Sequence, residues 1–337
     1  MVSSHILEHL DIFNCPACRA DLKFRDGVFK CCGCAKSYAI NKDGIPLFFY
    51  SSMTNNDINN VTEKMKDFYE NNPFPAYDEL DNINSLIDKA QKSIFANLLN
   101  EQIGFNVKVL EVGCGTGQMS NFLGISHRLV FATDICLNSL RLAQQFKEKH
   151  DLERVGFYQM NLFYPIFKDE SFDLVICNGV LHHTSNPFLG FQGIAKLVRK
   201  RGFIILGLYN RYGRFSTDLT RGLLNIFGSR AAFLDPRIRK INKSLKKRAA
   251  WFEDQYKNPH ESKHTFGEVL EWLEKEGFGF INSIPKFDMY SRFSEKELLF
   301  APHSQGNKMS RFFAQMNFLL SGGYEGGLFL LIARRIK

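Results

Sequence analysis

Cysteines are concentrated near the start of the chain, where five of the eight lie between Cys15 and Cys34. They include two Cys-x-x-Cys pairs separated by 12 residues. Two such pairs on hairpin turns can bring four thiolates to the corners of a tetrahedron, which Zn²⁺ favours. A redox-active pair would instead stand at a helix start, and no helical pattern begins there. Cys32 is not assigned as a ligand, because its use would leave a single residue between it and Cys34. The pattern predicts a closed structural zinc site formed by Cys15, Cys18, Cys31 and Cys34.

A glycine-rich stretch, residues 109–117 (VLEVGCGTG), is the second group that could bind a ligand. Glycines permit positive φ angles and a close approach of the backbone to a ligand. A dinucleotide-binding loop would read GxGxxG and hold a pyrophosphate at the helix start. This loop reads GxGxG and follows a glutamate, which is a poor neighbour for a phosphate. Glu111, Gly113, Gly115 and Gly117 therefore predict a site for a cationic ligand, such as an amino acid that carries a sulfonium.

Histidine is the side chain most often used as a catalytic base near neutral pH. His182 and His183 follow a predicted strand, at the edge where parallel sheets bind ligands. Tyr256 and His260 lie in residues 251–264, a stretch dense in aromatic, acidic and histidine side chains. These four residues are the candidates for contact with a substrate. The alternative is a structural role: at a helix start for His182 and His183, and at a domain edge for Tyr256 and His260.

Apolar runs that alternate with amphipathic segments supply the framework for these residues. Such strand–helix alternation predicts an α/β fold with a doubly wound parallel sheet. Thr265 can cap the last helix of the pattern, and Gly277 can end it. The predicted strands are residues 107–113, 129–135, 155–161, 172–179, 203–209, 280–285 and 328–336.

The chain divides into three predicted parts. Residues 1–50 carry short apolar runs and Gly and Asp turns, which predict small hairpins around the cysteines. Residues 51–106 begin as a polar linker and continue as a helical cap. Within this cap, residues 71–77 (NNPFPAY) are either an aromatic flap over the ligand or a turn stiffened by two prolines. Residues 107–337 are the predicted core.

A basic insertion, residues 209–264, interrupts the alternation of the core. It holds 13 Lys and Arg against 5 Asp and Glu, a net charge of +8, which equals the net charge of the whole chain. Such charge suits RNA, acyl carriers, phosphorylated metabolites or anionic lipid surfaces. Arg211 or Arg214 could hold an anionic acceptor, and a solvated loop is the alternative.

Composition narrows the class of protein. The chain is 45% hydrophobic and 23% charged, which is typical of a globular protein. It has no run of about 18 apolar residues, so no membrane span is expected. Its first residues lack the pattern of a secretory signal. We therefore expect a cytoplasmic protein with reduced cysteines, and the sequence does not predict an oligomeric state.

The cysteine segment resembles a known family. Within residues 11–50, the runs CPAC, FKCCGC and SYAINKDGIPLFF are similar to the zinc-ribbon family that includes the activator subunit of RNA and protein methyltransferases. The resemblance implies an N-terminal zinc-ribbon β module for folding or docking, not a catalyst. Whether it would dock on its own chain or recruit a partner stays open.

The glycine-rich loop resembles motif I of class I S-adenosylmethionine (SAM)-dependent methyltransferases, and a weaker resemblance covers residues 65–337. It implies a Rossmann-like, seven-stranded sheet with SAM as methyl donor, and a helical insertion. It also implies that Asp134 holds the two ribose hydroxyls, since a carboxylate offers two acceptors. Asn161 stands where the family usually has an Asp that accepts from the adenine amino group.

The fourth predicted strand extends the resemblance. Residues 171–178 match the signature of the family's fourth strand and end at Asn178, which joins the expected cofactor contacts. The next six residues, GVLHHT, follow as in the type-11 small-molecule branch. Asn178 is not followed by the Pro-Pro-aromatic run with which related enzymes hold an exocyclic amine, which favours an oxygen, carbon or ring-nitrogen acceptor.

Three functions remain in competition. The leading hypothesis is a SAM-dependent methyltransferase whose acceptor is a small or carrier-bound metabolite, which could be anionic. The alternative is a tRNA or rRNA methyltransferase, indicated by the ribbon and by the basic insertion. The third is a non-catalytic SAM-binding regulator.

Overall fold

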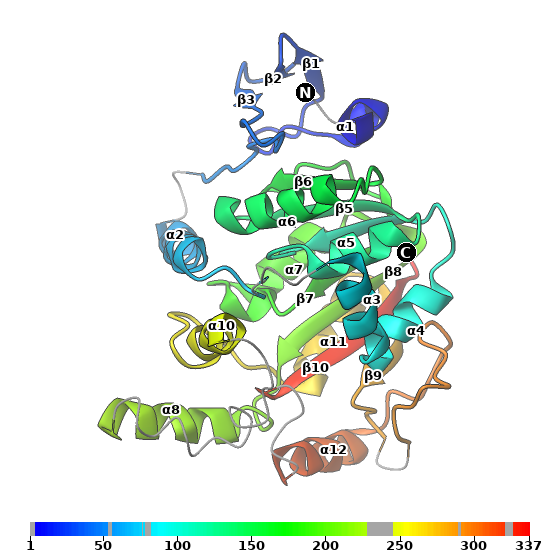
Figure 1. Cartoon of the computed structure of the whole chain (residues 1–337). Coiled ribbons are helices and arrows are strands. Elements are labelled where there is room, and N and C mark those ends of the chain that lie inside the picture. The colour runs from blue at the N-terminus through cyan, green and yellow to red at the C-terminus, as the bar shows by residue number, and fades with distance from the viewer. Residues whose placement is uncertain are drawn as a thin grey trace.

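The protein consists of a small β module and a larger α/β core (Figure 1). The structure, a computed structural model, describes residues 4–52, 56–75, 77, 82–227, 245–288, 291–320 and 326–337. Residues 228–244 of the predicted insertion, and Ala76 of the predicted flap, lie outside the described residues.

The core is built on a seven-stranded sheet with the order β6-β5-β4-β7-β8-β10-β9. The strands from β6 to β8 are parallel, and β10 runs antiparallel to both β8 and β9. All seven predicted strands are present, and the predicted α/β fold is confirmed. Their bounds are β4 (Lys108–Val112), β5 (Leu129–Asp134), β6 (Val155–Gln159), β7 (Phe172–Asn178), β8 (Val198–Tyr209), β9 (Phe278–Ile284) and β10 (Leu328–Arg335).

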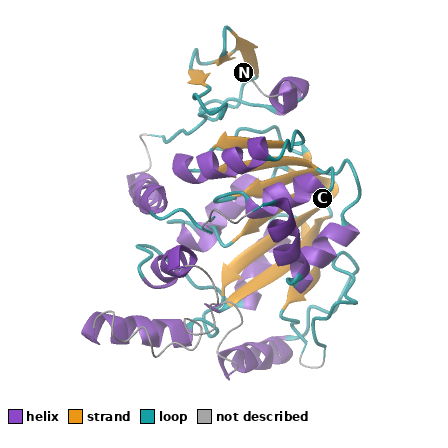
Figure 2. Cartoon of the chain, viewed as in Figure 1, coloured by secondary structure: helices purple, strands orange, loops and turns teal. Residues whose placement is uncertain are grey.

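Helices cover both faces of this sheet (Figure 2). Successive strand residues point to opposite faces, so neighbouring side chains enter different hydrophobic clusters. Val109 packs in the cluster with α3 (Ile83–Gln91), α4 (Ile94–Gln102), α5 (Gln118–Ile125) and α6 (Leu137–Lys149). Leu110 packs in the cluster with α7 (Pro187–Ala195) and α11 (Phe266–Lys275). This burial on both faces explains why the parallel strands are continuous apolar runs.

Local signals set the ends of α11 as predicted. The hydroxyl of Thr265 accepts a hydrogen bond from the backbone N–H of Glu268 (3.2 Å), and the Glu268 carboxylate accepts one from the backbone N–H of Thr265 (3.4 Å). This capping box satisfies N–H groups that the first turn leaves free. Gly277 follows the helix with φ of +77°, so both predicted ends are confirmed.

The N-terminal module docks on the β6 edge of the core. It contains α1 (Ser4–Glu8), a 3₁₀ turn (Leu10–Ile12) and the antiparallel strands β1 (Leu22–Arg25), β2 (Val28–Cys31) and β3 (Ser37–Ala39). Leu47 pairs in parallel with Gln159 of β6, and Phe13 pairs with Phe167. The side chains of Phe13, Phe29 and Phe48 are at most 1% exposed within a core cluster. The module thus packs on its own chain and covers a strand edge that would otherwise be unpaired.

Within the described residues, four further helices lie around the core. They are α2 (Asn56–Asn71), which precedes the core, α8 (Phe215–Phe227) and α10 (Leu245–Tyr256), which belong to the insertion, and α12 (Lys308–Leu320), which lies between β9 and β10. The sequence interpretation did not include α12. Within the described ranges, no helix combines the length and the apolar character that crossing a membrane requires.

Candidate functional site

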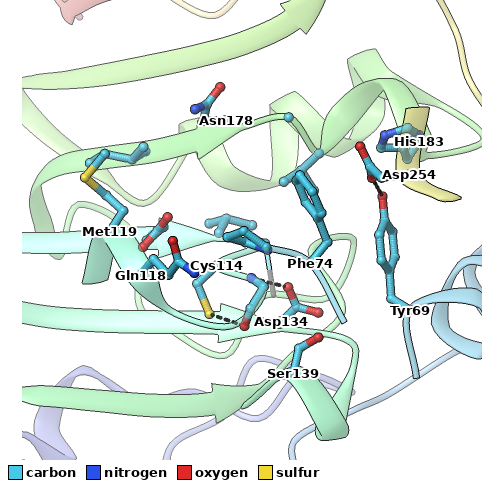
Figure 3. A pocket seen from close by; sticks show the side chains of 18 of the residues that line it. Tyr69, Phe74, Cys114, Gln118, Met119, Asp134, Ser139, Asn178, His183 and Asp254 are labelled. Atoms are coloured by element: carbon cyan, nitrogen blue, oxygen red, sulfur yellow. Dashed lines mark hydrogen bonds between the residues drawn. The ribbon is translucent and has the colours of Figure 1, made fainter. Parts of the chain in front are cut away.

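A cavity of about 610 Å³ lies where the parallel strands end. Its wall combines the carboxyl ends of β4, β5, β7 and β8 with parts of α2, α3, α5 and α10. The chain order reverses between β4 and β7, and such a switch point is where open α/β sheets bind ligands. The volume suits a small molecule of cofactor size. Figure 3 shows some of the side chains that line it.

The glycine-rich loop after β4 forms the floor of this cavity. Gly113 and Gly115 have φ of +71° and +54°, a region that other residues rarely adopt. A Cβ atom at Gly113 would lie 2.2 Å from Val180, and one at Gly115 would lie 2.2 Å from the carbonyl oxygen of Phe74. Neither position can accept a side chain without moving its neighbours. The loop therefore needs glycine both for its backbone angles and for close packing.

The Asn-Asn-Pro-Phe-Pro segment contacts this loop. The backbone N–H and the hydroxyl of Thr116 donate to the carbonyl oxygens of Phe74 (3.4 Å) and Pro75 (2.5 Å). Phe74 and Pro75 also line the cavity, into which Phe74 extends (Figure 3). Of the two readings of this segment, the contacts favour a flap that covers the loop.

Two buried carboxylates border the loop. Glu111 accepts a hydrogen bond from the hydroxyl of Ser120, and Asp134 accepts from the backbone N–H groups of Gly115 and Cys136, both at 2.8 Å. Burial raises the pKa of Glu111 to about 7 and that of Asp134 to about 6, and these hydrogen bonds oppose the shifts. Burial makes each negative charge costly unless a cation or a hydroxyl donor compensates it. A positively charged ligand with hydroxyl groups would supply that compensation.

Two asparagines also line the cavity. The amide nitrogen of Asn161 donates to the carbonyl oxygen of Tyr50 (3.1 Å), and its side-chain oxygen accepts from the N–H of Phe163 (3.1 Å). An amide oxygen has two lone pairs, so one is left for a ligand. Asn178 ends β7 on the wall of the cavity (Figure 3). Six of the seven residues assigned to the cofactor thus line the cavity, and their roles stay predictions. The seventh, Gly117, is the N-cap of α5 and does not line it.

His183 faces the cavity with a defined tautomer. Its Nδ1 lies 2.8 Å from the carbonyl oxygen of His260, which can only accept, so Nδ1 carries the hydrogen. In the neutral ring Nε2 then holds a lone pair. Burial lowers the pKa of His183 below 6.5, although the nearby charge of Asp254 opposes this shift. The side chain therefore remains a neutral base at neutral pH.

Two residues beside His183 were missed by sequence reasoning. The hydroxyl of Tyr69 donates to a carboxylate oxygen of Asp254 (2.8 Å), and the amide of Gln255 donates to the other (3.0 Å). Figure 3 shows Asp254 between Tyr69 and His183. Both Tyr69 and Asp254 line the cavity. The one available signal was an acid in a helix rich in aromatic residues, residues 251–256.

The other three candidate residues do not line the cavity. His182 is fully buried against Tyr209, with ring centroids 4.0 Å apart, and burial lowers its pKa well below 6.5. His260 binds the carbonyl oxygen of Thr184 through Nε2 (3.0 Å). Tyr256 is buried against Phe252. These contacts favour structural roles for all three side chains.

Arg214 is committed to an internal ion pair and not to a ligand. Its guanidinium donates to both carboxylate oxygens of Glu261, at 2.9 and 2.7 Å, and is fully buried. Burial raises the pKa of Glu261, but the hydrogen bonds and charges of Arg214 and Arg221 outweigh it and lower that pKa to about 2. Arg211 does not line the cavity. The structure therefore gives no support to an anionic acceptor held by either arginine.

The four predicted zinc ligands come together in the N-terminal module. The Sγ atoms of Cys15, Cys18, Cys31 and Cys34 lie within 4.8 Å of one another, with separations of 3.4 Å for Cys18–Cys31 and 3.7 Å for Cys15–Cys34. Four thiolates at Zn–S bonds of about 2.3 Å would be about 3.8 Å apart. The backbone N–H groups of Gly33 and Cys34 donate to the sulfur of Cys31, as is usual around metal-bound thiolates. The residues present fit a closed zinc site.

A Cys15→Ser variant is expected to lose bound zinc and to melt at least about 5 °C below the wild type, because the ribbon contributes buried phenylalanines to the core. Metal analysis and thermal unfolding measure both effects. Cys32→Ser is the matched control, since Cys32 is exposed and outside the cluster. A wild-type protein with less than half an equivalent of zinc would contradict the site.

Comparisons with known proteins agree with this geometry. Residues 110–206 match the Methyltransf_11 family, described as a methyltransferase domain. An uncharacterized protein from Synechococcus is 25% identical over 198 residues, which cover 52% of this chain and 48% of the relative. A ubiquinone biosynthesis O-methyltransferase from Glaesserella parasuis is 29% identical over 112 residues, 32% of this chain and 47% of the relative. The chain thus spans about half the length of these curated relatives.

Among solved structures, PKMT2 from Rickettsia typhi is similar, with a TM-score of 0.51 and 14% identity. The match covers 74% of this chain and 54% of that chain. At this identity the similarity shows a shared fold.

Proposed function

Because residues 110–206 form a methyltransferase domain, we propose that this protein is a SAM-dependent methyltransferase that acts on a hydroxyl group of a small, largely apolar molecule. The observation that carries the proposal is the meeting, in one cavity, of the acid-flanked glycine loop and of a histidine with a fixed tautomer. A SAM-binding regulator without activity would not require a neutral base in the cavity wall.

The chemistry of the donor set fits SAM. Glu111 provides negative charge for a cation, and each oxygen of Asp134 retains a lone pair for a ribose hydroxyl. Asn161 has one lone pair left for an amino group. Lys89 is the one cation among the described lining residues, and it suits the carboxylate of the methionyl group. When bound, SAM supplies a methyl group on a sulfonium sulfur, which is a good leaving group.

The residues near the ends of β7 and β8 provide the acceptor side. His183 holds Nε2 ready to take a proton from an acceptor hydroxyl, which raises the nucleophilicity of its oxygen. Phe74, Tyr209 and Trp251 make the surrounding wall largely aromatic and would exclude water from the reacting groups. The carbonyl oxygen of His260 fixes the ring of His183. Alignment and desolvation would then supply most of the rate enhancement.

The wall also bears on the charge of the acceptor. Lys89 hydrogen-bonds Gln118, which Figure 3 shows across the cavity from His183. On the His183 side the described lining residues include Asp254 and no lysine or arginine. A phosphorylated acceptor or an RNA backbone would find no cation among these described residues. An uncharged hydroxyl compound is therefore the proposed acceptor, and the relatives called ubiquinone biosynthesis O-methyltransferases support an oxygen acceptor.

Methyl transfer from SAM labelled in its methyl group tests the proposal. The full-length protein is incubated with an organic extract of cells, with a set of phenols and with total RNA. We expect label in the extract or in a phenol, and none in RNA. Label in RNA alone would replace the proposal with the RNA alternative, and SAM binding without transfer to any pool would support the regulator.

A further inference from the structure

Two helices outside the catalytic cavity expose apolar side chains to solvent. On α8, Phe215, Leu219, Ile226 and Phe227 are 59–74% exposed. On α12, Met309, Phe312 and Phe313 are 45–62% exposed. Large apolar side chains gathered on a surface usually mark a site of interaction, whereas single ones need no explanation.

On each helix, three of the exposed apolar residues lie along one face. Phe215, Leu219 and Ile226 are spaced by four and seven residues, which places them along one face of α8. On α12, Phe312 and Phe313 follow Met309 by three and four residues, which also places the three on one face. Both helices lie at the end of the molecule opposite the ribbon (Figure 1). The turn before α8 contacts α12, because a Cβ at Gly213 would lie 2.6 Å from Phe318 of α12.

The polar face of α8 is anchored to the protein. Asp218 pairs with Lys263 (2.5 Å), and Arg221 pairs with Glu261 (2.9 Å). The guanidinium of Arg221 also donates to the carbonyl oxygen of Gln255, a residue of the cavity wall. The apolar face is therefore directed away from the body by specific contacts, and it is connected to the acceptor side of the cavity.

The positive charge of the insertion and of the two helices indicates which kind of partner this surface binds. The insertion that contains α8 carries a net charge of +8. Along α8 and α12 the charged residues are Arg221, Lys308, Arg311 and Asp218, a net of +2. Asp218 is paired with Lys263 and Arg221 with Glu261, so Lys308 and Arg311 of α12 carry the excess positive charge. A second copy of the chain would bring the same positive charge and be repelled. Apolar helix faces beside excess positive charge fit the surface of a bilayer that contains anionic lipids.

We propose that the exposed faces of α8 and α12 form a docking surface for anionic phospholipid bilayers, with the apolar side chains inserted among the lipid headgroups. The surface neighbours the acceptor side of the cavity through Gln255. A lipid-dissolved acceptor could thus reach the cavity without crossing water. Membrane docking does not depend on the proposed chemistry, because its test needs no activity.

Sedimentation with vesicles tests this surface. The full-length protein is mixed with vesicles of phosphatidylcholine alone or with about 30% phosphatidylglycerol, at low and at high salt. We expect binding to the anionic vesicles, weakened by salt because the cationic part of the attraction is screened. A Phe215→Gln, Leu219→Gln, Ile226→Gln variant should lose at least about tenfold in partition, since three apolar side chains no longer insert.

The matched control changes three equally exposed apolar residues elsewhere, Phe105, Leu298 and Ile336, to Gln; their side chains are 62–76% exposed. This control should bind vesicles like the wild type, and both variants should keep the wild-type melting temperature. The proposal is overturned if the wild type ignores anionic vesicles or if the α8 variant binds them unchanged. It is also overturned if the α8 changes abolish a dimer, or if RNA and not lipid is retained.

Discussion

A Gly115→Arg variant is expected to bind SAM at least about a hundredfold more weakly than the wild type. A Cβ at this position would lie 2.2 Å from the carbonyl oxygen of Phe74, so the flap and the loop cannot keep their contact. The φ of +54° adds strain of about 1–2 kcal/mol for any side chain. The arginine would also bring a positive charge to a site proposed for a cation. Titration calorimetry with SAM measures the effect.

A control separates the backbone strain from the loss of space. Gly27, in the turn between β1 and β2, has a φ of +77° with nothing within 4 Å of a Cβ. Gly27→Ala therefore carries similar strain far from the cavity and should bind SAM like the wild type. If Gly115→Arg kept wild-type affinity, the glycine loop would not be the site of SAM.

A His183→Asn variant should lose at least about a hundredfold in kcat while its affinity for SAM stays unchanged. General bases typically contribute factors of about 10² to 10⁴. The Asn amide can still donate to the carbonyl oxygen of His260, as Nδ1 does in the wild type, but it offers no basic nitrogen. Steady-state kinetics at saturating SAM measure kcat, and calorimetry measures the affinity.

The pH profile adds a readout that a structural role would not give. In the proposed mechanism the neutral form of His183 is the active one, and burial lowers its pKa below 6.5. The wild-type kcat should therefore stay level as the pH falls to about 6.5 and decline only below it, and the variant should lack this decline. His127→Asn, at an exposed left-handed position that Asn tolerates, is the control. An unchanged kcat in His183→Asn would exclude this base.

The sequence predicted the features that depend on local spacing. All seven strands of the core sheet were identified, because continuous apolar runs reflect burial on both faces of the sheet and amphipathic helical segments separate them along the chain. The cysteine spacing predicted the zinc cluster, and Thr265 predicted the start of α11. The glycine pattern predicted the loop under the cavity. Each of these signals lies within a few residues of the feature that it specifies.

Features that depend on distant contacts were not predicted. The ribbon docks by strand pairing between Leu47 and Gln159, and no local pattern states which edge it will meet. Tyr69 and Asp254 are hydrogen-bonded although they are 185 positions apart in the sequence. Within residues 251–264, Tyr256 and His260 were predicted to contact the substrate. The register of α10 instead places Asp254, and not Tyr256, on the wall of the cavity. Arg214 was interpreted as exposed or ligand-binding because its partner, Glu261, lies 47 residues away.

The central claim is that the loop between Glu111 and Gly117 holds a sulfonium nucleoside. Titration of the full-length wild type with SAM, and separately with NAD, tests it most directly, with Asp134→Ala as the comparison. We predict that one SAM binds per chain, that NAD does not bind, and that Asp134→Ala weakens SAM strongly because the ribose loses its acceptor. Binding of NAD without binding of SAM would contradict the claim.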